Sequence, residues 1–183
     1  MYEILSPKQD LRNLIWLTIS IYYQNVRGLR TRCKDLYNSS AICGHDIIAL
    51  SETWLNTSIR DTELFYSNCI VDRCDRSSLP SVYTRGGGLL VSVRSNFPSE
   101  QLYVAGTESL EIVFVKISLK VNLYVWCVYI PPGSNNSLYD QFSVAFKNFL
   151  NLIHCSFQDI VLVCGDFNCP IEWVSHADNA NNY

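Results

Sequence analysis

The sequence predicts a mixed α+β fold, an α/β sandwich. Three observations favour this class: short apolar runs dominate, two segments have clear helical periodicity, and some neighbouring runs are joined by very short turns. Such turns are too short for the crossover that a purely parallel sheet requires between strands. The chain has 183 residues, 48% of them apolar and 17% charged, which is the composition of a single globular domain over 1–183.

The elements can be assigned in order along the chain. Strands are expected where apolar or β-prone residues run together, at 14–23, 47–50, 67–73, 88–93, 110–119, 123–130 and 160–164. Helices are expected over 29–43 and 138–153, because apolar residues recur there at every third or fourth position. Residues 175–183 are polar and unpatterned, and we expect an irregular tail.

Charge and cysteine content limit the classes of function. The formal charge of −3 gives no indication of nucleic acid, so a DNA-binding face would depend on local Arg and Lys placement or on a bound cation. The eight cysteines include no CxxC pair and have no histidine at ligand spacing, which argues against zinc and favours reduced thiols in an intracellular protein. The run 14–23 is too short to cross a membrane, and no membrane association is expected.

Polar residues of catalytic types stand at the ends of four expected strands. Asn25 ends the first, Glu52 the second, Tyr129 a later one, and Asp166 with Asn168 the last. Strand ends present side chains to a shared rim, where carboxylate, amide and phenol oxygens could hold a hard divalent cation. Such a cation suits phosphoryl chemistry better than acyl transfer. Singly, each residue has an ordinary structural explanation, such as a turn; their coincidence at four strand ends favours a site.

Five motifs resemble those of the endonuclease/exonuclease/phosphatase superfamily, and within it the apurinic-like endonucleases of Jockey-like non-LTR retrotransposons. The motifs are Asn25-Val-Arg-Gly-Leu, Ser51-Glu-Thr-Trp-Leu, Arg85-Gly-Gly-Gly-Leu-Leu-Val, Tyr129-Ile-Pro-Pro-Gly and Gly165-Asp-Phe-Asn. They occur in the family's order over residues 15–173. The resemblance implies two mixed β-sheets packed face to face, with helices outside.

The resemblance also implies a phosphodiesterase dependent on Mg²⁺ or Mn²⁺ that nicks DNA by metal-assisted attack of water. Glu52 would bind the metal, with Asn25 beside it to orient the metal or a neighbouring carboxylate. Asp166 would accept a proton from the attacking water or align it. Asn168 would hydrogen-bond the scissile phosphate or hold Asp166, and Tyr129 would donate to a phosphate oxygen.

Further expectations concern substrate and partners. Arg27 is a candidate substrate contact, together with Tyr129 and Asn168. DNA is the expected partner, along with a reverse transcriptase domain of the same polyprotein, and the protein would be nuclear when acting on DNA. The same motifs leave two alternatives open: a related enzyme acting on sphingomyelin, inositol phosphate or RNA, and a non-catalytic remnant that binds metal or DNA weakly.

The sequence departs from the family at its end. Family members have a further Asp and a closing Ser-Asp-His segment on the last strands, whereas this chain has Ser175-His176-Ala177-Asp178 shortly after Asn168. His176 is therefore a weak candidate for the family histidine. We expect a C-terminally truncated domain that lacks the closing strands, leaving one sheet incomplete, and that has little or no activity alone.

Overall fold

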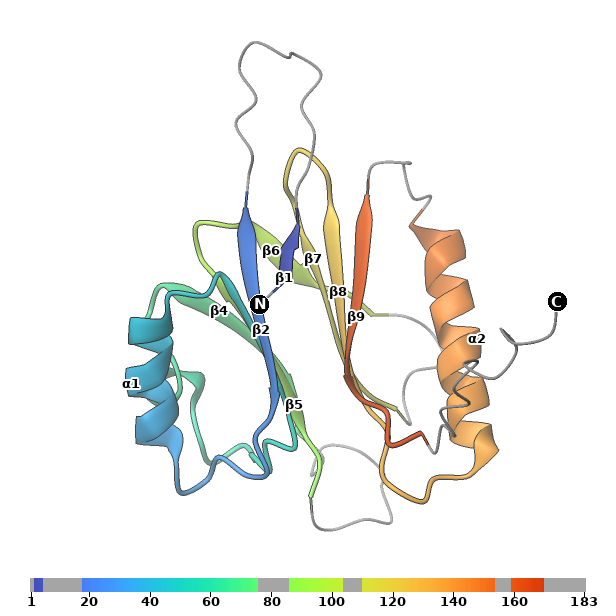
Figure 1. Cartoon of the computed structure of the whole chain (residues 1–183), viewed down its shortest axis with the longest axis horizontal. Helices are drawn as coiled ribbons and strands as arrows, with labels where there is room; N and C mark the ends of the chain where they lie inside the picture. Colours follow the sequence, from blue (N-terminus) through green and yellow to red (C-terminus); the bar gives the residue numbers. More distant parts are fainter. Residues whose placement is uncertain (1, 5–17, 76–85, 104–109, 154–158, 170–183) are drawn as a thin grey trace, which may run out of the picture.

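A computed structural model describes residues 2–4, 18–75, 86–103, 110–153 and 159–169 (Figure 1). In these residues the first sheet has five strands in the order β1-β2-β3-β5-β4, and the second has four in the order β6-β7-β8-β9. The first comprises β1 (Tyr2–Ile4), β2 (Ile19–Asn25), β3 (Ile47–Ser51), β4 (Cys69–Cys74) and β5 (Leu89–Arg94). The second comprises β6 (Ser99–Gln101), β7 (Glu111–Ile117), β8 (Leu123–Tyr129) and β9 (Ile160–Asp166).

The predicted class is confirmed, because both sheets mix parallel and antiparallel pairs and the helices lie outside them. Helix α1 (Cys33–Cys43) lies beside the first sheet and α2 (Asn136–Leu152) beside the second, on opposite sides of the molecule (Figure 1). A short 3₁₀ helix, η1 (Asp61–Glu63), follows β3.

Three apolar layers hold this arrangement together. The central layer lies between the sheets and contains the inward residues of both, among them Ala49, Val91, Val113 and Val125, all fully buried. A second layer joins the first sheet to α1 and the loops near it, and a third, rich in aromatic rings around Trp126, joins the second sheet to α2. Burial of this apolar surface is the main stabilising contribution.

Two β-α-β units set the position of the strand ends. Helix α1 carries the chain from β2 to β3, which are parallel, and α2 does the same for β8 and β9. Because parallel strands end at the same edge of a sheet, β2 with β3 and β8 with β9 each deliver their carboxyl ends together.

Several predicted boundaries differ from those observed. The first strand runs from Ile19 to Asn25, whereas residues 14–17 lie outside the described part, as does the tail 175–183. The first helix begins at Cys33, not at residue 29, because residues 26–29 extend along the loop after β3: the Gly28 and Leu29 amides donate to the Glu52 and Thr53 carbonyls at 2.7 and 2.8 Å. The short strands β1 and β6 were not predicted.

Candidate active site at the strand ends

The candidate residues at the ends of β2 and β9 meet across the two sheets. The Asn25 side-chain Nδ2 donates a hydrogen bond of 2.7 Å to Asp166 Oδ2, although 141 positions separate them in sequence. Within the sheets, Asn25 is paired with Ser51, the last residue of β3, and Tyr129 is paired with Asp166. The ends of β2, β3, β8 and β9 therefore form one rim.

Both carboxylate oxygens of Asp166 accept hydrogen bonds. Asn25 binds Oδ2, and the backbone amide of Asn168 donates to Oδ1 at 3.3 Å. The Asn168 side chain in turn donates to the Ile130 carbonyl at 2.9 Å, which ties the turn after β9 to the end of β8. Neutral donors thus orient a carboxylate that can accept a further proton or hydrogen bond.

Glu52 lies just beyond β3 and has a left-handed backbone with φ of 57°. This conformation breaks the alternation of the strand and is uncommon for a residue with a side chain. Glu52 Oε2 accepts hydrogen bonds from the Gly87 amide at 3.0 Å and from the indole nitrogen of Trp54. The carboxylate is therefore held by the glycine-rich segment before β5 and by its own loop.

The other predicted residues take different positions. Arg27 is exposed, and its backbone amide donates to Asn25 Oδ1 at 3.2 Å, so its backbone helps to fix Asn25 while its side chain lies at the surface. Tyr129 is only 4% exposed and packs in the layer between the sheets, which gives it a structural role as well as a place at the rim. His176 lies outside the described residues.

Sequence reasoning missed Glu111, a buried carboxylate beside the rim. Glu111 is 6% exposed, is paired with Tyr129 in the second sheet, and accepts a hydrogen bond of 2.6 Å from the Gly88 amide. Consecutive amides, those of Gly87 and Gly88, therefore hold Glu52 and Glu111. The available signal was a carboxylate at an inward position of the strand pattern, because such positions are normally apolar.

A hydrogen bond between the Tyr23 and Ser51 hydroxyls, on the inner face of the first sheet near Asn25, was not predicted from the sequence either. Tyr23 precedes Asn25 by two residues on β2, and its hydroxyl is 2.9 Å from the Ser51 hydroxyl. Burial raises the pKa of Tyr23 to about 12, with smaller contributions from Cys127, Asp166 and Cys164, while the Ser51 hydrogen bond lowers it. The phenol is therefore neutral at ordinary pH and acts as a hydrogen-bonding group under the rim.

The donor set at the rim fits a hard divalent cation. Glu52 and Asp166 offer carboxylate oxygens, and the described residues contain no group of three His, Cys, Asp or Glu side chains that could hold a metal. Mg²⁺ is commonly held by one or two carboxylates, with water and substrate phosphate completing the shell. Glu52 and Asp166 each offer carboxylate oxygens of the kind used in that mode, and each carboxylate is already oriented by N–H donors.

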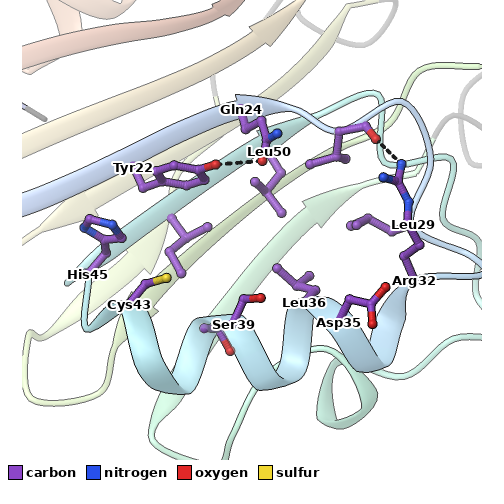
Figure 2. Close-up of a pocket in the computed structure, with 13 residues that line it drawn as sticks. Tyr22, Gln24, Leu29, Arg32, Asp35, Leu36, Ser39, Cys43, His45 and Leu50 are labelled. Atoms are coloured by element: carbon purple, nitrogen blue, oxygen red, sulfur yellow. Dashed lines mark hydrogen bonds between the residues drawn. The ribbon is translucent and has the colours of Figure 1, made fainter.

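A separate cavity of about 330 Å³ lies between α1 and the outer face of the first sheet (Figure 2). Arg32 and Asp35 stand at one end and His45 at the other, and Tyr22 donates to Gln24 within it at 2.7 Å (Figure 2). Tyr22 and Gln24 of β2 line this cavity, whereas Tyr23 and Asn25 face the inner side. None of the candidate site residues lines this cavity.

Comparison with known proteins identifies the class. The sequence model of the Endonuclease/Exonuclease/phosphatase family matches residues 23–182, which is most of the chain. The chain belongs to the Endonuclease/Exonuclease/phosphatase family. None of the curated proteins compared with it matches significantly.

Solved structures of related fold include three of particular interest. The endonuclease domain of TRAS1, a telomere-specific non-LTR retrotransposon, has a TM-score of 0.56 at 14% identity over 82% of this chain and 61% of its own. An AP endonuclease from Archaeoglobus fulgidus has a TM-score of 0.56 at 17% identity over 84% and 59%. TDP2 from Caenorhabditis elegans has a TM-score of 0.57 at 14% identity over 82% and 47%. At these identities the likeness establishes the fold.

The chain spans about half to three-fifths of the length of these solved structures. In the parts of the chain that the structure describes, no helix has the length and hydropathy needed to cross a bilayer.

Proposed function

We propose that this chain is part of a Mg²⁺- or Mn²⁺-dependent phosphodiesterase of retroelement type that nicks DNA. The observation that carries the proposal is the Asp166 carboxylate, which is held by Asn25 from the other sheet on the rim that Glu52 adjoins. Family membership supports hydrolysis of a phosphoester as the reaction class. The motif forms around Glu52 and Tyr129, and the related fold of a retrotransposon endonuclease domain, support the retroelement branch.

The residues divide the work according to their chemistry. Asp166 accepts a proton from the attacking water or aligns it, because its oxygens are fixed by Asn25 and Asn168. Asn168 and Tyr129 supply neutral donors for phosphate oxygens, which is the arrangement that stabilises developing negative charge. Arg27, whose side chain is exposed two residues after Asn25, would contact a phosphate of the DNA backbone.

The metal would be held by Glu52, with Asn25 close to it. When bound, Mg²⁺ or Mn²⁺ would act as a Lewis acid on the phosphate and help to ionise water. The Gly87 amide and the Trp54 indole determine which way the Glu52 carboxylate faces before any metal arrives. That preorganisation avoids part of the entropy loss on binding.

The partners follow from the same proposal. DNA is the substrate, a reverse transcriptase domain of the same polyprotein is the functional partner, and the site of action is the nucleus. Because the chain spans only part of its relatives, the proposed activity is that of the whole domain, to which these 183 residues contribute the Asn25, Glu52 and Asp166 portion.

Metal binding is tested by thermal melting with millimolar Mg²⁺ or Mn²⁺. A ligand that prefers the folded state raises the melting temperature by mass action, and Glu52→Gln should remove most of the rise. Glu100→Gln is the matched control. Glu100 lies on the edge strand β6 and forms an exposed ion pair with Lys116 of β7, so the change removes the same charge away from the rim. An equal rise in wild type and Glu52→Gln would place the metal elsewhere.

Activity is tested by nicking of supercoiled plasmid with Mg²⁺. Asp166→Asn should lower the rate by about 10²-fold or more, as expected for loss of a general base. A chimera that adds the closing strands of a related element should nick faster than the chain alone. Cleavage of RNA, sphingomyelin or inositol phosphate in place of DNA would move the proposal to another substrate. No cleavage by either protein, with no thermal shift, would indicate a non-catalytic chain.

A further inference from the structure

The turn that carries Asp166 and Asn168 is held from outside the sheet by helix α2. The hydroxyl of Tyr139, in the first turn of α2, donates to the carbonyl oxygens of Phe167 at 3.1 Å and Asn168 at 3.0 Å. One phenolic proton is shared between two successive carbonyls, a bifurcated arrangement. The Tyr139 contact is therefore with the backbone of the turn and leaves the site side chains accessible to a substrate.

The turn needs this support because its backbone is in an uncommon conformation. Asn168 has φ of 44°, in the left-handed region, which asparagine tolerates better than most residues but does not prefer. The Phe167 ring packs edge-on against Phe142 with centroids 5.6 Å apart, and Phe142 lies three residues after Tyr139 on α2. Tyr139 thus fixes the backbone of the turn, and Phe142 fixes the Phe167 ring.

The same turn sets the geometry of the candidate general base. The Asn168 amide donates to Asp166 Oδ1, and the Asn168 side chain donates to the Ile130 carbonyl. Displacement of the turn would weaken the first of these bonds and leave Asp166 held mainly by Asn25. We propose that Tyr139 is a positioning residue of the active site, acting through Asn168 on Asp166; this inference rests on the proposed function.

Tyr139→Phe removes the hydroxyl and keeps the ring. Losing one neutral hydrogen bond and misaligning the base should lower kcat for plasmid nicking about three- to tenfold, with KM within about twofold. The backbone order parameter of Asn168, measured by ¹⁵N relaxation, should fall from about 0.85 toward 0.6 or below. Tyr22→Phe is the matched control, because the Tyr22 hydroxyl also donates a hydrogen bond, of 2.7 Å to Gln24, but on the face of β2 that points away from Asn25.

The two readouts separate the inference from the proposed function. An unchanged order parameter at Asn168 in Tyr139→Phe would show that the hydroxyl does not hold the turn, whatever the activity. Increased mobility with unchanged kcat would show that the turn does not govern catalysis. A uniform loss of order across the chain would indicate general destabilisation and would also overturn the inference. If the wild type cleaves no substrate, the proposed function fails, while the relaxation data still decide whether Tyr139 holds the turn.

Discussion

Replacing Gly165 with alanine should disrupt the second sheet at the point where β9 approaches the rim. Gly165 has φ of 148°, and a Cβ built there would lie 1.9 Å from the Val128 carbonyl oxygen, 2.8 Å from its carbon and 2.9 Å from its nitrogen. These are backbone atoms of the fully buried neighbouring strand β8, so no side chain can turn aside. Real Cβ atoms essentially never come within 3.0 Å of such neighbours, so the strands must separate by about 1 Å.

The expected loss is large on the scale of protein stability. A non-glycine residue in an unfavourable backbone region costs about 1–3 kcal/mol. Strand separation would add lost packing and lengthened hydrogen bonds, so we expect Gly165→Ala to lower the free energy of unfolding by about 4 kcal/mol or more. Most domains have only about 5–15 kcal/mol in total, so the variant should be marginally folded.

A second glycine separates the steric clash from the backbone strain. Gly133, in the turn after β8, has φ of 73° but nothing within 4 Å of a built Cβ. Gly133→Ala should therefore cost only the backbone strain, about 1 kcal/mol. Urea unfolding followed by circular dichroism and fluorescence measures both variants. Equal losses in the two variants, or a loss below about 1 kcal/mol in Gly165→Ala, would refute the steric reasoning.

Two further predictions concern charge and ionisation. Arg73 is paired with the buried Asp75 at 2.6 Å, so Arg73→Ala should destabilise the fold by about 3–5 kcal/mol, whereas Lys116→Ala, which breaks a more exposed pair with Glu100, should cost below about 1 kcal/mol. Similar losses in urea unfolding would contradict this difference. Because burial raises the pKa of Tyr23 to about 12, from an ordinary value of 10.0, the unfolded chain ionises first and the free energy of unfolding should fall as the pH rises from about 10 to 12. Tyr23→Phe should show a shallower fall, and unfolding curves of the two proteins with the same pH dependence would exclude this origin.

Periodic patterns predicted the long elements well and the short ones poorly. The predicted strand 123–130 and helix 138–153 match β8 and α2 within two residues, because both are long and have strong apolar patterns. Strand β6 has only three residues, Ser99–Gln101, without apolar alternation, and its place in the sheet depends on pairing with β7. Leu29 misled the helix prediction because it fits the apolar stripe of α1 but is buried, at 4% exposed, in the loop before it.

The candidate site was predictable in part because its residues stand at strand ends. Asn25 and Asp166 could be expected at one rim from residue type and strand order, but their hydrogen bond across the sheets could not. Glu111 was missed because its partner, the Gly88 amide, lies 23 residues away, just before strand β5 of the other sheet. Pairs of this kind depend on how the two sheets pack, and a local pattern in the sequence does not contain that information.

The backbone strain of the described residues gathers where the chemistry is proposed. The non-glycine residues with positive φ there are Arg27, Glu52, Trp54 and Asn168, each within three residues of the end of β2, β3 or β9. Such conformations persist only where surrounding contacts fix them, as when the Trp54 amide donates to the Gly87 carbonyl at 2.9 Å. Stability alone would favour relaxed turns at these positions. The concentration of strained conformations at one rim is therefore better explained by a requirement to orient Glu52 and the turn that carries Asn168. This agrees with a preorganised site, in which side chains are placed before substrate binds.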